Sequence, residues 1–151
     1  MIEPPRLVID TNVLVAAMRS KTGPSYALMQ AIRQGRARMC ASPALFLEYE
    51  DVLKRAEQLE ATGLAAEDVD AILGDLARLM IPVLTHYQWR PQLRDPSDEM
   101  VLEAAVNARA QAIATYNLRD FQPAKSFGIA VLKPEQAFIR LNIAVPRRPT
   151  P

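Results

Sequence analysis

Short apolar runs alternate with longer amphipathic stretches along the chain. The short runs are rich in aliphatic and β-branched residues and predict five strands. These strands are expected at residues 7–10, 38–41, 81–85, 112–115 and 129–132. The longer stretches repeat apolar residues at helical spacing, which predicts helices. We expect the helices near residues 12–18, 24–35, 43–60, 67–79, 97–109 and 134–141.

Residue types at the ends of these stretches agree with the assignment. Ser42 and Asp95 each precede a proline, which is typical of an N-cap followed by the first helical position. Gly35 and Gly63 stand where a helix C-terminus favours a left-handed residue. Because strands and helices alternate, we predict an α/β fold, a three-layer α/β/α sandwich around a mainly parallel sheet.

The length of 151 residues corresponds to one domain. We assign residues 1–142 to it and expect the proline- and arginine-rich residues 143–151 to form a disordered tail. Half of the residues are hydrophobic and 23% are charged, as in globular proteins. Since the net charge is only +1, nucleic-acid binding would have to rest on local basic patches.

Cysteine and histidine are scarce. The single Cys40 excludes an intramolecular disulfide, and one cysteine with one histidine cannot build a zinc site of Cys and His ligands. No apolar stretch approaches the ~20 residues of a membrane span, and the N-terminus lacks the apolar segment of a signal peptide. We therefore expect a cytoplasmic protein without a membrane partner.

Asp10 is the first candidate for chemistry because it closes the apolar run of the first predicted strand. Ligand and catalytic sites of open α/β sheets form at the carboxyl ends of strands. A charge buried there needs a compensating partner. Glu48 lies at the border of the apolar face of its predicted helix, where a solvated glutamate is the simplest interpretation.

The helix after Pro96 contains two adjacent acids, which helical spacing separates. Asp98 shares a face with Leu102 and Ala105, so we expect it to point inward. Glu99 falls in line with Glu103 and Asn107, and we expect this polar stripe to face water. Asp95 is explained by its role as an N-cap.

A further set of polar residues follows the fourth predicted strand. Thr115, Asn117 and Asp120 can each offer an oxygen atom, although Asn117 or Asp120 can equally cap the turn. With Asp10, Glu48 and Asp98 they can meet at one rim of the sheet. Carboxylates gathered there would repel one another unless joined by a divalent cation. An all-oxygen ligand set without His or Cys selects Mg²⁺ or Mn²⁺, which suits phosphodiester hydrolysis by an activated water.

Four motifs in this order resemble those of a PIN-domain ribonuclease of the VapC type, the toxin of bacterial and archaeal toxin–antitoxin pairs. The resemblance spans about Arg6 to Leu141. Its motifs are Val8-Ile9-Asp10-Thr11-Asn12-Val13-Leu14, Ser42-Pro43 with Glu48-Tyr49-Glu50-Asp51-Val52-Leu53, Asp95-Pro96-Ser97-Asp98-Glu99 with Leu102-Glu103-Ala104-Ala105, and Ala114-Thr115-Tyr116-Asn117-Leu118-Arg119-Asp120-Phe121.

The resemblance implies an α/β/α sandwich, a Mg²⁺- or Mn²⁺-dependent RNA endonuclease, frequent homodimerisation and often inhibition by a small DNA-binding antitoxin. By position, the three metal-holding acids of the family correspond to Asp10, Glu48 and Asp98, with Glu99 as a weaker metal candidate. Asn117 stands where many members have a fourth acid, which leaves one negative charge fewer. Asp120 can partly substitute for it, and Thr115 and Thr11 match polar positions that orient water or backbone.

These observations predict an endoribonuclease whose acids hold the metal, while Asn117 and Thr115 help to position the attacking water. The rim cations Arg90, Arg94, Arg119 and Lys125 are candidates for contact with RNA. The alternative is a catalytically weak or inactive domain that binds RNA or a protein. Aspartyl-phosphate chemistry is disfavoured because Asn12 occupies the position of its second aspartate. ATP hydrolysis of the P-loop type is excluded because the sequence contains no P-loop motif.

Two apolar features have simpler explanations. His86, Tyr87 and Trp89 are expected to pack at the sheet edge or a dimer contact rather than to stack on bases. The helix that carries Val69, Ile72, Leu73, Leu76 and Leu79 is expected to belong to the core, and it could also supply a homodimer or antitoxin groove.

Overall fold

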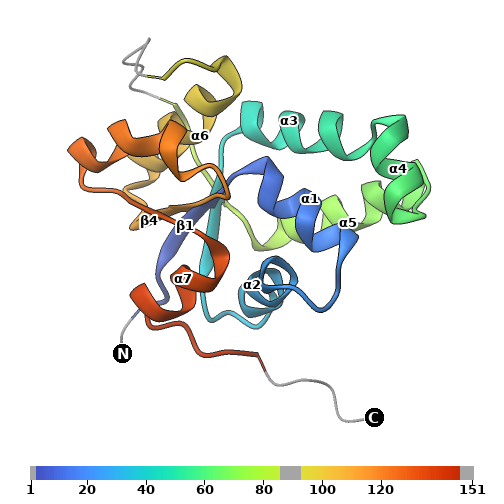
Figure 1. The fold of residues 1–151 in the computed structure, drawn as a ribbon, viewed down its shortest axis with the longest axis horizontal. Helices are drawn as coiled ribbons and strands as arrows, with labels where there is room; N and C mark the ends of the chain where they lie inside the picture. Colours follow the sequence, from blue (N-terminus) through green and yellow to red (C-terminus); the bar gives the residue numbers. More distant parts are fainter. Residues whose placement is uncertain (1–2, 86–92, 147–151) are drawn as a thin grey trace.

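The computed structural model describes residues 3–85 and 93–146. All of its strands lie in one parallel sheet in the order β3-β2-β1-β4-β5. Figure 1 shows β1 and β4 with helices packed around them. The strands are β1 (Arg6–Ile9), β2 (Arg38–Ala41), β3 (Ile81–Pro82), β4 (Ala112–Ala114) and β5 (Ala130–Leu132). In the centre, Val8 pairs with Cys40 on one side and with Ile113 on the other. The α/β class and the five predicted strands are confirmed, except that β3 ends at Pro82 instead of extending to Thr85.

Helices connect the strands and cover the sheet. They are α1 (Thr11–Arg19), α2 (Pro24–Arg33), α3 (Pro43–Leu53), α4 (Ala56–Thr62), α5 (Ala66–Leu79), α6 (Pro96–Ala108), the 3₁₀ helix η1 (Leu118–Phe127) and α7 (Pro134–Arg140). Helix α6 contacts β1, β2 and β4, whereas α7 contacts β4, β5 and α2. The crossover from β3 to β4 through α6 runs back across the sheet, opposite in direction to the crossover from β1 to β2 through α1 and α2. Right-handed crossovers therefore place α6 on one face of the sheet and α2, which contacts α7, on the other. The β1 residues Leu7, Val8 and Ile9 are consequently fully buried, as expected for a parallel sheet covered on both faces.

The caps predicted from the sequence are present. The Ser42 side chain accepts a hydrogen bond from the Leu45 N–H at 3.2 Å, and Asp95 accepts one from the Ser97 N–H at 2.8 Å. Gly35 and Gly63 both adopt φ of +75°. These local signals depend only on neighbouring residues, which explains why they were readable.

Two predicted elements differ from the structure. The single helix expected at 43–60 is two helices, because Arg55 leaves the helical conformation at φ −62° and ψ 141° and starts α4. The change of direction lets Leu59 pack against the core. The η1 helix was not predicted, since Pro123 lies inside it and removes a backbone donor.

The carboxyl ends of the strands bring side chains from distant parts of the chain together. Backbone pairing continues one residue beyond two strands, because the Asp10 N–H donates to the Ala114 carbonyl and the Thr115 N–H donates to the Leu132 carbonyl, both at 2.9 Å. Asp10 and Thr115 are therefore held side by side at the edge of the sheet.

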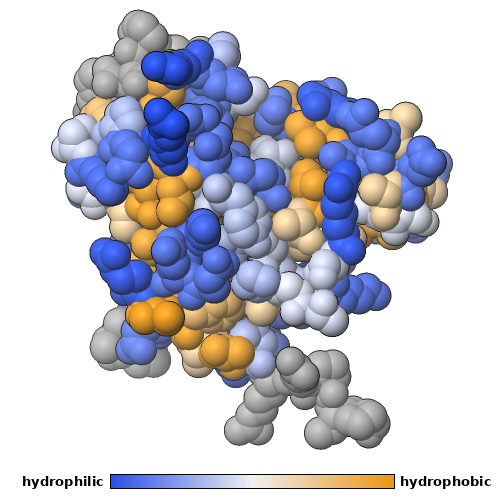
Figure 2. Space-filling view, viewed as in Figure 1, coloured by the Kyte–Doolittle hydropathy of each residue, from blue (hydrophilic) through white to orange (hydrophobic). Residues whose placement is uncertain are grey.

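The chain keeps contact with the fold beyond α7. Ile143 is buried, and the Arg36 guanidinium donates to the carbonyls of Ala144 and Val145 at 3.2 and 2.8 Å. Residues 147–151 lie outside the described part, so the extent of the predicted tail stays a prediction. Figure 2 shows apolar side chains in several separate patches on the viewed face. Among the described residues, no helix is long and apolar enough to cross a membrane.

Candidate active site

Asp10 is the buried acid at the end of β1. Only 8% of it is exposed, and its Oδ2 accepts a hydrogen bond of 2.8 Å from the hydroxyl of the fully buried Thr115. Burial raises the pKa of the Asp10 carboxyl, and the negative charges of Asp95 and Glu48 raise it further. The hydrogen bonds from Thr115 and the Thr11 backbone act in the opposite direction. The ionised form of Asp10 therefore lacks sufficient positive compensation from the chain itself.

Asp98 lies in the first turn of α6, where the structure brings it into the electrostatic field of Asp10. It is half-buried, and burial raises its pKa to about 6, with the charges of Asp10, Asp95, Asp120 and Glu99 adding to the effect. A carboxyl whose ionisation is opposed by so many neighbouring acids is an attractive ligand for a cation. We refer to Asp10, Glu48, Asp98, Thr115 and Asn117 together as the acid site.

Glu48 reaches the acid site from α3. It is half-buried, and its charge contributes to the raised pKa of Asp10. The neighbouring Tyr49 is fully buried and its hydroxyl donates to the carbonyl of Ile9, the residue before Asp10. This hydrogen bond fixes α3 against the end of β1. Nothing in the sequence around Tyr49 indicates this hydrogen bond, because the partner of its hydroxyl is 40 residues away.

Asn117 and Asp120 are joined to Asp10 through Thr115. The Asn117 N–H donates to the Thr115 hydroxyl at 2.9 Å, and the Asn117 side-chain amide donates to Asp120 Oδ2 at 2.6 Å. A continuous set of hydrogen bonds thus runs from Asp120 to Asp10. Asn117 and Asp120 are exposed, whereas Thr115 is not.

The predicted solvent-facing stripe on α6 is wrong for two of its members. Glu99 and Glu103 are 4% and 7% exposed, and Asn107 is half-buried. Helix α6 packs against the sheet, α3 and η1, so it is covered on more than one side. In addition, Glu99 Oε1 accepts a hydrogen bond of 2.7 Å from the backbone N–H of Leu93. Glu99 thus stabilises the segment that leads into α6, a structural role that competes with metal binding.

Two contributors to the site were missed by sequence reasoning. Asp95 does cap α6, but its charge also raises the pKa of Asp10 and of Asp98. Asn12 Oδ1 accepts a hydrogen bond from the Tyr116 N–H at 3.3 Å and so joins the start of α1 to the segment after β4. In the sequence, the only indication of these roles is that Asn12 is close to Asp10 and Asp95 is close to Asp98.

The donor set of the acid site fits a hard divalent cation. Carboxylate oxygens dominate it, and the mutual repulsion of Asp10 and Asp98 would be relieved by a positive ion. Within residues 3–85 and 93–146, no three or more His, Cys, Asp or Glu side chains are grouped closely enough to hold a metal as they stand. The charges of Glu48 and Asp98 interact electrostatically with that of Asp10. Metal binding would require the three side chains to turn toward a common point.

Three of the four predicted RNA-binding cations lie among the described residues. Arg94, Arg119 and Lys125 are exposed in the structure. The fourth predicted RNA contact, Arg90, and the aromatic-rich run with His86, Tyr87 and Trp89 lie outside the described residues.

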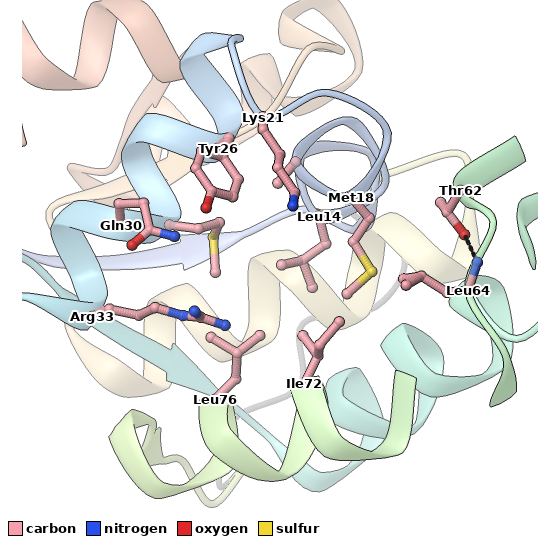
Figure 3. A pocket seen from close by; sticks show the side chains of 12 residues that line it. Leu14, Met18, Lys21, Tyr26, Gln30, Arg33, Thr62, Leu64, Ile72 and Leu76 are labelled. Carbon is pink, nitrogen blue, oxygen red and sulfur yellow. Dashed lines mark hydrogen bonds between the residues drawn. The ribbon is translucent and has the colours of Figure 1, made fainter. Parts of the chain in front are cut away.

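A pocket separate from the acid site lies between α1, α2 and the α4–α5 region (Figure 3). Its volume is about 330 Å³. Leu14, Met18, Ile72 and Leu76 converge in its interior, and Lys21 and Arg33 extend over them. The side chains that line it are Leu14, Ala17, Met18, Lys21, Tyr26, Met29, Gln30, Arg33, Thr62, Leu64, Ile72 and Leu76. None of the acid-site residues contributes.

Comparison with known proteins agrees with the geometry. Residues 6–119 match the family model described as PIN domain, which covers the sheet from β1 through β4 and the whole acid site. Among curated proteins, none matches the chain.

Proposed function

The chain belongs to the PIN-domain family, and on this basis we propose that it is a divalent-metal-dependent endoribonuclease that hydrolyses RNA phosphodiester bonds. Family membership supports a nuclease-type function in general. The observation that carries the proposal is the position of buried Asp10 at the end of β1, held by Thr115 and close enough to Asp98 for their charges to interact, with both pKa values raised. Perturbed carboxyls at the carboxyl ends of parallel strands are typical of a functional site.

In this proposal Asp10, Glu48 and Asp98 would hold Mg²⁺ or Mn²⁺. When bound, the ion supplies Lewis acidity that activates water and balances charge on the phosphoryl group. Thr115 orients the Asp10 carboxylate through its hydrogen bond. Asn117, placed by Thr115 and Asp120, would orient water at the outer edge of the site. The exposed cations Arg94, Arg119 and Lys125 would bind phosphates of the RNA.

A catalytically weak binding module is the alternative, and Asn117 is the residue that favours it. An amide in place of a fourth acid lowers the negative charge, and this amide is already hydrogen-bonded to Asp120. Calorimetric titration with Mn²⁺ separates the two possibilities. If the protein is a nuclease, it should bind Mn²⁺ with a dissociation constant on the order of millimolar or lower. The Asp10→Asn variant should lose this binding. An absence of such binding by folded protein would favour the binding module.

Cleavage assays then test the proposed activity. Purified protein is incubated with single-stranded and structured RNAs in the presence of Mn²⁺ or EDTA. We expect cleavage that requires the metal and disappears in Asp10→Asn. Metal-independent cleavage, or full cleavage by Asp10→Asn, would contradict the proposal.

We also propose that the protein is the cytoplasmic toxin of a toxin–antitoxin pair, with an antitoxin protein as its partner. The pocket between α1, α2 and α5 supports this part of the proposal. Its apolar interior can receive apolar side chains, and Lys21 and Arg33 would pair with acidic residues beside them. The test is co-purification with the product of the adjacent reading frame. The double variant Lys21→Glu with Arg33→Glu changes two exposed cations of the pocket and should abolish co-purification while RNA cleavage persists. Unchanged co-purification would contradict docking in this pocket.

Homodimerisation belongs to the same proposal. Sedimentation of the purified protein over a range of concentrations would test it, and a monomer at all concentrations would contradict it.

The identity of the RNA would follow from sequencing the 5′ ends of cleavage products.

A further inference from the structure

An exposed aromatic ring stands between two residues of the acid site. Tyr116 follows Thr115 and precedes Asn117, and 39% of it is exposed. Segments that follow a strand usually carry small or polar residues, which makes a large ring at this position notable. Neither the fold nor the metal ligands of the proposed function require it.

Two hydrogen bonds restrict the orientation of Tyr116. Its backbone N–H donates to Asn12 Oδ1 at 3.3 Å, and its hydroxyl lies 2.6 Å from the hydroxyl of Ser25. Ser25 is buried in the first turn of α2, so it provides a fixed anchor. Because the phenol hydroxyl is engaged with Ser25, the surface that Tyr116 offers to a ligand is its ring. A ring held in this way loses little further conformational entropy on binding.

The backbone of Tyr116 lies beside the acid site. Thr115 donates to Asp10, and adjacent Cα atoms are only ~3.8 Å apart. Tyr116 is thus within reach of the nucleotide whose phosphate meets the acid site. Aromatic side chains near such a site bind unpaired bases by stacking, with little preference for sequence.

We propose that the Tyr116 ring stacks on an unpaired base next to the scissile phosphate. This inference rests on the proposed ribonuclease function and adds a substrate-binding residue to it. The stacked base would fix the register of the RNA strand relative to Asp10 and Asp98. Tyr116 contributes to substrate binding, and Ser25 acts through it as a positioning residue.

The first test compares variants of Tyr116 in RNA cleavage. Loss of one stacked base corresponds to a roughly 5- to 150-fold weakening. We expect Tyr116→Ala to raise KM for single-stranded RNA by a factor in this range, with a smaller change in kcat. Tyr116→Phe and Tyr116→Trp should retain most of the affinity. Tyr116→Leu, which keeps apolar bulk without an aromatic face, should behave like Tyr116→Ala.

A purely structural role predicts a different pattern. If Tyr116 served only to join β4 to α2 through Ser25, then Tyr116→Phe and Ser25→Ala would be as harmful as Tyr116→Ala, and thermal stability would fall in parallel with activity. The comparison of Tyr116→Phe with Tyr116→Leu remains decisive if Tyr116→Ala fails to fold. Equal KM values for Phe and Leu variants would overturn the proposal.

A second measurement does not depend on cleavage. Short RNAs that carry 2-aminopurine at successive positions are titrated with protein in EDTA, and quenching of the fluorescent base reports stacking. We expect quenching at one position with wild type and Tyr116→Phe, and none with Tyr116→Leu. A duplex of the same sequence should bind more weakly.

The outcomes separate this inference from the function on which it rests. Ring-dependent quenching without any RNA cleavage would contradict the proposed nuclease and support the stacking. Cleavage with unchanged KM in Tyr116→Leu would support the nuclease and overturn the stacking. Neither cleavage nor quenching by well-folded wild-type protein would overturn both.

Discussion

The hydroxyl of Thr115 donates a hydrogen bond of 2.8 Å to Asp10 Oδ2, although the two residues are 105 positions apart in the chain. Both follow strands that are neighbours in the sheet, so the parallel arrangement of β1 and β4 produces the contact. The same hydroxyl accepts a hydrogen bond from the Asn117 N–H. Thr115 therefore fixes the orientation of Asp10, the most buried acid of the acid site, and places the Asn117 amide beside it.

Replacement of Thr115 by valine tests this relationship. Thr115→Val keeps the side-chain shape but removes the donor to Asp10 and leaves the Asn117 N–H without its acceptor. Since a hydrogen bond to a charged group contributes about 1.5–3 kcal/mol, we expect RNA cleavage to fall by about 10- to 100-fold. Thr115→Ser retains the hydroxyl and is the matched control. Equal activity of the valine and serine variants would show that the bond has no role.

The raised pKa of Asp98 predicts how stability of the metal-free protein depends on pH. In the folded state this carboxyl ionises near pH 6, whereas its ordinary value is 3.8. Between these values the folded state binds more protons than the unfolded state, so stability decreases as pH rises through this window. Asp10 acts in the same direction.

Thermal unfolding in EDTA at a series of pH values measures the effect. We expect Tm of wild type to decrease between about pH 4 and about pH 7, and the decrease to be smaller in Asp98→Asn. Mn²⁺ affinity should rise over the same window, because binding displaces a proton from Asp98. If Asp98→Asn showed the same pH dependence of Tm as wild type, the assignment to Asp98 would be incorrect.

The hydrogen bond from Tyr49 to the Ile9 carbonyl connects stability with site geometry. Tyr49→Phe removes the donor within a fully buried environment, which typically costs about 1–3 kcal/mol. Urea denaturation should show this loss. We also expect weaker Mn²⁺ binding, because α3 carries Glu48 and would be less firmly held. A variant with reduced stability and unchanged metal affinity would indicate that Tyr49 supports only the fold.

Asp98 and Glu99 are adjacent acids with opposite expected responses to substitution. Asp98→Asn should reduce Mn²⁺ affinity while leaving folding at neutral pH intact or improved. Glu99→Gln weakens the acceptor for the Leu93 N–H, so it should lower the free energy of unfolding by about 1–2 kcal/mol. Calorimetry measures the Mn²⁺ affinity of both variants, and urea denaturation measures their free energies of unfolding. A greater loss of metal affinity in Glu99→Gln than in Asp98→Asn would indicate that Glu99, and not Asp98, is the metal ligand.

The elements of this fold were predictable where they depend on local residues. Short β-branched runs, Ser42 before Pro43 and the left-handed Gly63 determine strands, caps and a helix end through neighbouring atoms. The position of Asp10 at a strand end followed from the same pattern. The order of the strands and the contact of Asp10 with Thr115 are properties of the sheet, which topology rules anticipate only in outline.

The features that were not predicted depend on packing between distant segments. Glu99 has the helical spacing of a solvent-facing residue, but Leu93 and the packing of α6 bury it. Tyr49 satisfies an apolar pattern while its hydroxyl serves a carbonyl on β1. The helix breaks at Arg55 because the chain changes direction there, and neither Arg55 nor its neighbours Lys54 and Ala56 is a residue type that predicts a break.

The most direct test of the account is single-turnover cleavage of a single-stranded RNA in Mn²⁺ by wild type, Asp10→Asn and Asp98→Asn. Asp51→Asn is the matched control, because Asp51 is an exposed acid on α3 that pairs with Arg55. We predict cleavage by wild type and by Asp51→Asn, with at least a roughly 100-fold loss in both acid-site variants. Undiminished cleavage by either acid-site variant would contradict the assignment of these two carboxylates to a metal-dependent ribonuclease centre.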